Sequence, residues 1–301
     1  MSSQLFSPFT MRGLTIDNRT IVSPMCEYSA EDGNATDWHL MHLGQFATSG
    51  IGLVITEAAA VEPRGRITAQ DLGLWCDDNE EALGRVMRFC REYGQAKMGI
   101  QLAHAGRKAS THRPWEGRDP LKEGAGAWET ISSSANPQGE GWHTPRSMDR
   151  AEMDVVRDAF VEATKRSDRL GFDMIEVHGA HGYLLHEFLS PIANTRNDEY
   201  GGPIDNRMRY PLEVFAAMRA VWPEEKPMGI RISATDWEEH GWTPEDSVVF
   251  AGKLKELGCD YICASSGGIS GNTRLELGEG YQVDFAEKIR NETGMPTMAV
   301  G

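Results

Sequence analysis

The stretch DRAEMDVVRDAFVEATKRSDRLGFDMIEVHGAHGY, residues 149–183, contains a helix, a buried strand and a polar turn in succession. Apolar residues recur in its first half at intervals of 3, 4 and 3, at Met153, Val156, Phe160 and Ala163. This spacing places one apolar stripe along a helix, and Asp149 with Glu152 fits a capping box at its start. The apolar run 174–177 that follows predicts a strand covered on both faces.

The same alternation of helix and strand extends along the chain in both directions. Short apolar, strand-forming runs occur at 20–23, 52–56, 98–102, 174–177, 228–232, 261–264 and 297–300. Thr243 and Pro244 predict the start of a further helix and Gly258 its end. The residues expected on the inner face of this helix are Val249, Phe250, Leu254 and Leu257. Apolar strands that alternate with helices predict a parallel sheet with both faces covered.

No GxGxxG pattern lies between the first strand and its helix, which argues against a doubly wound dinucleotide-binding sheet. Polar residues of catalytic types instead follow many of the strands. They are Cys26, Tyr28, Glu57, Gln101, His104, His178, His181, Arg231, Asp236, Ser265 and Ser266. Functional groups at several strand ends are typical of the C-terminal mouth of a TIM (β/α)8-type barrel. The sequence therefore predicts an α/β fold of this type.

The length of 301 residues fits one such barrel, so we expect a single domain over residues 1–301. A long segment, about 104–147, lacks clear periodicity and is rich in Gly, Pro and Trp, which is typical of a lid or a subunit contact. The chain stops at Gly301, immediately after the seventh predicted strand. The eighth βα unit, and with it the C-terminal end of the barrel, is therefore expected to be missing from this chain.

Composition restricts the partners and the compartment. A net charge of −15 repels phosphate backbones and anionic lipid, so neither nucleic acid nor a membrane is expected as a partner. No apolar run approaches the roughly 18 residues that a membrane span needs. The five cysteines form no CxxC pair, and no apolar signal region follows Met1, so a cytoplasmic location is expected.

The histidines at 178 and 181 allow three interpretations from their own chemistry: a metal pair, packed side chains, or a catalytic pair. No third ligand with zinc-like spacing accompanies them, so no metal is predicted. Tyr183 lies two residues further on and offers a phenolic proton donor. Two imidazoles and a phenol together suit the polarisation of a carbonyl and the protonation of its α-carbon. Cys26 alone fits a small buried hydrophobic residue equally well.

Five segments together resemble the Old Yellow Enzyme family of FMN-dependent ene-reductases, whose members are NADH:flavin oxidoreductases. They are IVSPMCEYSAEDG (21–33), TEAAAVEPRGRIT (56–68), GIQLAHAGRKAS (99–110), IEVHGAHGYLLHEFLSPIANTRNDEYGGPIDNR (175–207) and GYQVDFAEKIR (280–290). Cys26 with Tyr28 and the RPWEG loop (113–117) resembles the bacterial subclass that includes xenobiotic reductases. The segments follow the family order over nearly the whole chain.

This resemblance implies FMN as cofactor, NADPH or NADH as reductant, and activated alkenes, namely α,β-unsaturated carbonyl or nitro compounds, as small-molecule substrates. A homo-oligomer is also expected. On the substrate side, His178 and His181 would bind the carbonyl oxygen, Tyr183 would protonate the α-carbon, and Tyr28 would face the substrate. On the flavin side, Cys26 would tune the ring, Gln101 would meet its pyrimidine edge and Arg231 would lie near N1 and O2. The remaining implied FMN contacts are Ser23, Pro24, Met25, Ala60 and, for the phosphate, Gly301.

Two alternatives remain at this point. The chain could be the barrel domain of a dienoyl-CoA reductase type flavoprotein, although Cys26 and Tyr28 fit the simple ene-reductases better. It could also be a truncated, non-catalytic scaffold, whose exposed strand edges would favour association.

Overall fold

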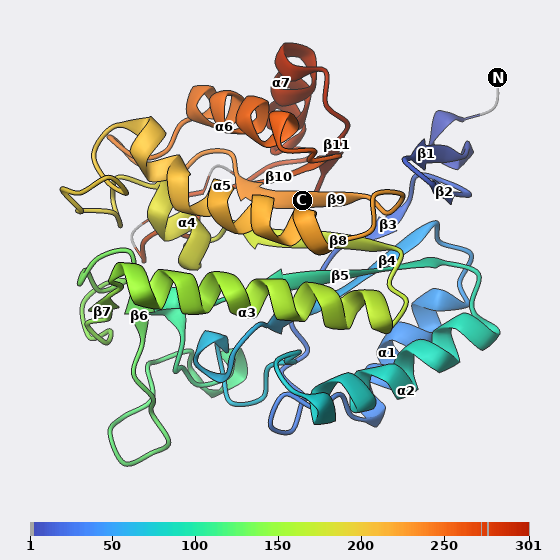
Figure 1. Ribbon diagram of the computed structural model, residues 1–301, viewed down its shortest axis with the longest axis horizontal. Helices are drawn as coiled ribbons and strands as arrows, with labels where there is room; N and C mark the ends of the chain where they lie inside the picture. The colour runs from blue at the N-terminus through green and yellow to red at the C-terminus, as the bar shows by residue number, and fades with distance from the viewer. Residues whose placement is uncertain (1–2, 272, 276, 301) are drawn as a thin grey trace.

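A computed structural model describes residues 3–271, 273–275 and 277–300 and has a parallel, seven-stranded sheet at its centre (Figure 1). In spatial order the strands are β3 (Ile21–Val22), β4 (Leu53–Ala60), β5 (Lys97–Ala103), β8 (Met174–Gly179), β9 (Met228–Ser233), β10 (Ile262–Ser265) and β11 (Thr297–Ala299). All seven predicted strands are therefore confirmed. Every residue of β4 and β8 is buried, which explains why these strands are largely apolar rather than alternating.

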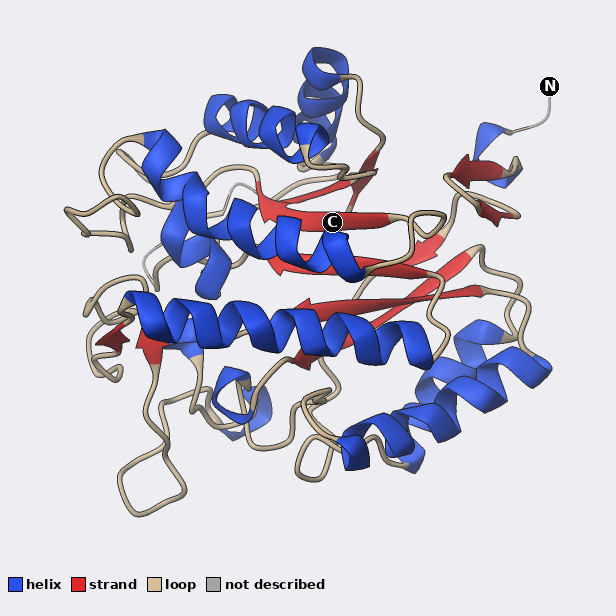
Figure 2. Ribbon diagram, in the orientation of Figure 1, coloured by secondary structure: helices blue, strands red, loops and turns tan. Residues whose placement is uncertain are grey.

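Helices surround the strands (Figure 2). They are α1 (Asp37–Ala47), α2 (Asp77–Tyr93), α3 (Arg150–Arg169), α4 (Leu184–Leu189), α5 (Ile204–Val221), α6 (Pro244–Glu256) and α7 (Val283–Thr293). Helices α1 and α2, α3 and α5, and α6 and α7 contact one another in pairs. Since the helices cover the outer face, the other face of the sheet is free to carry inward-pointing polar residues at the strand ends.

The predicted helix starts are confirmed by their caps. The Asp149 carboxylate accepts a hydrogen bond from the Glu152 amide, and Thr243 forms a capping box with Asp246. One part of the prediction for α6 is wrong, because Val249 is 46% exposed. The buried residues of α6 are Ser247, Phe250, Ala251 and Leu254. Phe250 and Leu254 are therefore confirmed, and Ser247 and Ala251 complete the buried stripe in place of Val249.

The hairpin of β1 (Phe9–Met11) and β2 (Leu14–Ile16) was not predicted, because its strands are too short to show a period. Its apolar residues pack with residues of β4, β8 and β10 in a second apolar cluster. The members that lie at its centre are Met11, Leu14, Ile16, Leu53, Met174 and Tyr261. Figure 1 shows the hairpin at the amino ends of the strands, opposite α4. It therefore closes the end of the curled sheet that lies away from the predicted site.

Strand β3 pairs only with β4, and β11 only with β10, among the residues that the structure describes. The sheet is therefore open between these two edges, as expected for seven strands of a barrel that closes at eight. A hollow of about 390 Å³ lies along the opening, lined by residues of β1, β3 and β11 and by Arg19 and Arg290.

The long segment after β5 is mostly irregular, as predicted, but it is not without structure. It contains the 3₁₀ turns η3 (Gly106–Lys108) and η4 (Pro114–Glu116) and a small parallel pair, β6 (Ile131–Ser132) with β7 (Arg146–Ser147). A third 3₁₀ turn, η2 (Pro63–Gly65), follows β4, and a fourth, η1 (Gln4–Phe6), precedes β1. In the described part of the chain, none of the helices has the length and apolar character needed to cross a bilayer.

Candidate active site

The carboxyl ends of β8, β9 and β10 bring predicted site residues to one edge of the sheet. His178 on β8 lies opposite Arg231 on β9 in the parallel register. The last residue of β10, Ser265, has its hydroxyl 2.7 Å from Nε2 of His181 and 3.4 Å from Nη2 of Arg231. The ends of three strands thus bring His178, His181, Arg231 and Ser265 next to one another.

His178, His181 and Tyr183 form a compact group of rings. The His178 ring lies 5.1 Å from that of His181 and 4.9 Å from that of Tyr183, measured between centroids. The third pair, His181 and Tyr183, is separated by 6.5 Å, and all three pairs meet edge to face. The structure therefore brings the predicted catalytic residues together.

The protonation of this group follows from its surroundings. The Ala180 amide donates a hydrogen bond to Nδ1 of His178, so the proton of a neutral imidazole lies on Nε2. Burial, followed by the charges of Arg231 and Lys108, holds the pKa of His178 well below its ordinary value. Burial likewise raises the pKa of Tyr183 well above its ordinary value. The group consists of neutral imidazoles and a protonated phenol.

Cys26 and Tyr28 approach this group from the segment after β3. Both are only partly buried, and both contribute electrostatically to the raised pKa of Tyr183. The pKa of the Cys26 thiol is raised by burial and by the carboxylates of Asp71 and Glu57. Tyr28 has a left-handed backbone, with φ of +49°, and its ring packs edge to face against Trp115. Strained backbone of this kind concentrates at functional sites.

Lys108 is a site residue that the sequence analysis did not identify. Its ammonium group donates hydrogen bonds to the backbone oxygens of His181 (2.7 Å) and Gly268 (3.1 Å), and it lies 4.9 Å from the centroid of the Tyr183 ring. Burial lowers the pKa of Lys108 to about 8. Lys108, Tyr28, Arg118 and Tyr183 line a hollow of about 100 Å³ beneath the long segment. Lys108 lies within a segment that resembles the family, but no spacing singled it out.

Gln101 and Glu176, which are buried, and the partly buried Arg231 form a polar group on adjacent strands. Nε2 of Gln101 donates to Glu176 Oε1 at 2.8 Å, and burial raises the pKa of Glu176 while the Arg231 charge opposes this. Oε2 of Glu176 and Nε of Arg231 are buried without a hydrogen-bond partner. Glu176 was missed, although a carboxylate inside an otherwise apolar strand, two residues before His178, was a usable signal. Unpartnered buried atoms of opposite polarity suit a bound polar ring.

Of the remaining predicted cofactor residues, those that the structure describes lie at or after the ends of β3 and β4. Ala60 ends β4 and, with Tyr183, borders a small hollow. Ser23 and the exposed Met25 border a hollow against α1, and Pro24 is partly buried between them. Gly301 lies outside the described residues. In the part of the chain that is described, no cluster of three or more His, Cys, Asp or Glu side chains could hold a metal ion.

Three other polar residues that were predicted at strand ends have local partners instead, and Glu57 lies within β4 rather than after it. Glu57 pairs with His39 at 2.9 Å and accepts the Glu27 amide, so it lies behind Cys26. His104 pairs with Glu62 at 3.0 Å. Asp236 lies 3.0 Å from the buried His186 on α4.

Three comparisons with known proteins bear on this site. The model of the NADH:flavin oxidoreductase / NADH oxidase family matches residues 4–301. The chain is 44% identical over 303 residues to an NADPH dehydrogenase of Geobacillus sp. (strain WCH70), covering all of this chain and 84% of that protein. It is 43% identical over 310 residues to an NADH:flavin oxidoreductase of Gibberella zeae, covering 97% of this chain and 75% of that protein.

The comparison with solved structures supports the barrel fold. Morphinone reductase in complex with tetrahydroNAD matches with a TM-score of 0.79 and 26% identity, over 100% of this chain and 81% of that one. An old yellow enzyme homologue from Zymomonas mobilis matches with a TM-score of 0.82 over 99% of this chain and 82% of that one, and its 23% identity supports the fold alone.

Proposed function

Because the chain belongs to the NADH:flavin oxidoreductase / NADH oxidase family, and is thus an oxidoreductase that uses FMN with NAD(P)H, we propose that it is an ene-reductase. Its substrates would be α,β-unsaturated carbonyl or nitro compounds. The observation that carries this proposal is the group formed by His178, His181 and Tyr183 beside the polar group of Gln101, Glu176 and Arg231. We further propose that residues 1–301 act as one FMN-binding unit.

The residues present fit a flavin. The pyrimidine edge of its ring has both donors and acceptors, and the atoms left without partners are a guanidinium N–H of Arg231 and a carboxylate oxygen of Glu176. Gln101, buried beside them, has a carbonyl oxygen and a second N–H to offer. Bound FMN would supply the redox chemistry, taking a hydride from NAD(P)H and giving one to the alkene β-carbon. We propose that it is held by Ser23, Pro24, Met25, Cys26, Ala60, Gln101, Arg231 and Gly301.

The substrate residues would act in the following way. Neutral His178 would donate from Nε2 to the carbonyl or nitro oxygen, and His181 would be the second donor, so that negative charge developing on this oxygen is stabilised. Tyr183 would give its phenolic proton to the α-carbon, which completes the addition of one hydride and one proton across the double bond. Tyr28 would bound the substrate pocket, and Cys26 would contact the ring face.

The test is an anaerobic assay with FMN-reconstituted protein, in which NADPH and NADH are compared as reductants and 2-cyclohexen-1-one is the oxidant. We expect bound flavin absorbance, bleaching by the nicotinamide and recovery on adding the enone. A 2,4-dienoyl-CoA thioester serves as the competing substrate, and faster turnover of the thioester would favour the dienoyl-CoA reductase alternative. Protein that retains flavin but is not reoxidised by either alkene would refute the ene-reductase proposal.

Two expectations about context remain as proposals. We propose a homo-oligomer, because Trp38, Met41 and Tyr93 leave large apolar surfaces exposed on the adjoining helices α1 and α2. Sedimentation velocity would test this. We propose a cytoplasmic location, because all five cysteines are free.

A further inference from the structure

The turn that carries His181 and Tyr183 has an unfavourable backbone. His181 and Gly182 are both left-handed, with φ of +60° and +74°. A Cβ atom on Gly182 would lie 2.1 Å from the backbone oxygen of Gly268, so the turn is also pressed against the loop after β10. Left-handed backbone is disfavoured for a residue with a side chain, and a turn of this kind persists only where its surroundings hold it.

Each of the three amides at positions 181–183 of this turn has an identified partner. The His181 amide donates to Ser233 Oγ at 2.9 Å, and that hydroxyl in turn donates to the Gly267 oxygen at 2.8 Å. The Tyr183 amide donates to the oxygen of Ala180 at 3.1 Å. The amide between them, that of Gly182, donates to Nδ1 of His186 at 2.9 Å. The peptide that joins the two proposed catalytic residues is thus held by a side chain of α4.

The hydrogen bond from Gly182 determines the state of His186. Nδ1 can accept only if it carries no proton, so the proton of the imidazole lies on Nε2. Nε2 lies 3.0 Å from Oδ1 of Asp236, off the ideal hydrogen-bond direction, and both side chains are fully buried. Since Nδ1 and Nε2 have distinct partners, rotation or reprotonation of the ring would break one contact or both.

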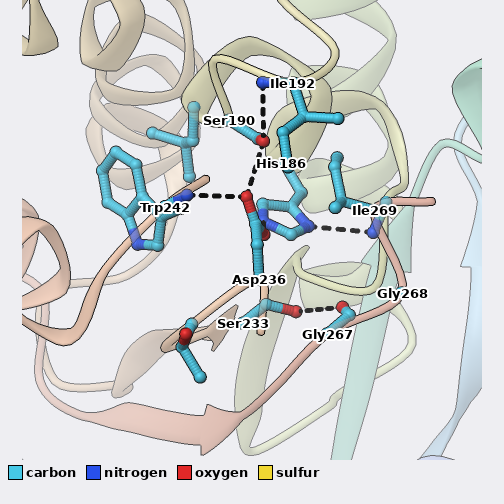
Figure 3. Close-up of polar contacts among 12 residues, drawn as sticks. His186, Ser190, Ile192, Ser233, Asp236, Trp242, Gly267, Gly268 and Ile269 are labelled. Atoms are coloured by element: carbon cyan, nitrogen blue, oxygen red, sulfur yellow. Dashed lines mark hydrogen bonds and ion pairs between the residues drawn. The ribbon is translucent and has the colours of Figure 1, made fainter. Parts of the chain in front are cut away.

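Asp236 is itself held in place by two short hydrogen bonds. Its Oδ2 accepts from the Ser190 hydroxyl at 2.6 Å and from the Trp242 amide at 2.7 Å. Figure 3 shows Ser190 and Trp242 converging on this carboxylate beside His186, with Ser233 bonded to Gly267 nearby. Burial raises the pKa of Asp236, but His186, Ser190 and Trp242 outweigh this and lower it overall. The carboxylate is therefore a fixed negative charge 3.0 Å from Nε2 of His186.

We propose that His186 is a positioning residue: oriented by Asp236, it holds the Gly182 amide and thereby sets where His181 and Tyr183 stand relative to His178. The proposal rests on the catalytic roles proposed above for His181 and Tyr183. His186 itself is not proposed to contact the substrate. If its role were only structural, replacing it would lower the stability of the protein but would not move the turn.

The experiment compares His186→Asn, His186→Phe and Ser190→Ala in FMN-reconstituted protein. Asparagine places a carbonyl oxygen near the position of Nδ1 and can still accept from Gly182, whereas phenylalanine keeps the ring volume and loses both contacts. Ser190→Ala removes one of the bonds that hold Asp236. Ser167→Ala is the matched control, since Ser167 is equally buried and its hydroxyl donates to the Ala163 oxygen within α3.

Three measurements report on the turn. In His186→Phe we expect the Gly182 amide to exchange with solvent at least about tenfold faster, as loss of one hydrogen bond implies. We expect the enone half-reaction to slow at least about tenfold while flavin reduction is unchanged, because only the enone step uses Tyr183. His186→Asn should restore Gly182 protection, Ser190→Ala should fall between, and Ser167→Ala should change neither the exchange nor the enone rate. A ¹⁵N-histidine spectrum of the unmodified protein should show His186 protonated at Nε2.

These outcomes test the positioning role of His186 separately from the ene-reductase proposal. Unchanged Gly182 exchange in a folded His186→Phe variant, or a proton on Nδ1, would overturn the positioning role. If His186→Phe fails to fold, His186→Asn and the tautomer still decide the question, since loss of Gly182 protection in the asparagine variant contradicts the role. If the protein reduces no alkene at all, the ene-reductase proposal fails, while the exchange and tautomer results still test whether His186 holds the turn.

Discussion

Tyr183→Phe is the sharpest test of the proposed chemistry, because the variant removes one proton donor and little else. The Tyr183 ring is flanked by the His178 ring at 4.9 Å and by the Lys108 ammonium at 4.9 Å, and neither contact involves the phenolic oxygen. The phenylalanine ring should therefore occupy the same place. The pKa of Tyr183 is raised, first by burial and then by Cys26 and Tyr28, so the phenol is protonated at ordinary assay pH.

The expected size of the effect follows from this geometry. Since the ring stays in place, the loss is that of a general acid, which is worth about 10²-fold to 10⁴-fold in the step that uses it. Enone reduction should slow by this factor. Flavin reduction by NADPH should keep its rate, because no proton from Tyr183 is needed there. In the unmodified protein, enone reduction should show no decline near pH 10 from ionisation of Tyr183, since its pKa lies above that value.

Anaerobic stopped-flow absorbance separates the two half-reactions. Tyr210→Phe is the matched control, because Tyr210 is also buried and its hydroxyl donates only to the Met153 oxygen at 3.0 Å. The control should lose about 1 kcal/mol of folding free energy and keep both rates. Equal slowing of both half-reactions in Tyr183→Phe, or no slowing of enone reduction, would refute the assignment of Tyr183 as the proton donor.

Three further changes test other parts of the site. His178→Ala should slow enone reduction about 10²-fold, because one of two donors to the developing oxyanion is lost, and an unchanged single-turnover rate with FMN bound would contradict the role. Cys26→Ala should shift the flavin midpoint potential in a spectroelectrochemical titration at a stability cost of about 1 kcal/mol, since only one heavy atom is removed; a large fall in melting temperature without a potential shift would make Cys26 a packing residue. Burial opposes ionisation of Glu62, but His104 and Arg64 outweigh it and lower the pKa of Glu62 to about 2. The ionised Glu62 therefore stabilises the fold when the pH is above about 4.5, the pKa of the unfolded state, and this contribution is lost as the pH falls toward 2. Urea unfolding at pH 7 and pH 3 should therefore show a smaller loss of stability at pH 3 in Glu62→Gln, by about 2 kcal/mol, and equal losses would count against the ion pair.

The local sequence was sufficient to predict the central strands, the starts of two helices and the part of the site formed by His178, His181 and Tyr183. The strands were predictable because residues buried on both faces must be apolar, and the starts of α3 and α6 were predictable because Asp149 and Thr243 can cap a helix within three residues of chain. His178, His181 and Tyr183 could be grouped for the same reason, since they fall within six consecutive residues and cannot separate far. The resemblance of the quoted segments to a family supplied the cofactor, which no spacing could have named.

Tertiary structure decided what depends on the alignment of distant strands and loops. Gln101, Glu176 and Arg231 meet because β5, β8 and β9 pair in one parallel register, and a shift of one residue would turn each side chain to the other face. Lys108 reaches the turn after β8, and Asp236 reaches His186, across 73 and 50 residues of chain respectively. Contacts at such separations leave no period in the sequence, because they arise only when the sheet has formed and its strand ends lie side by side.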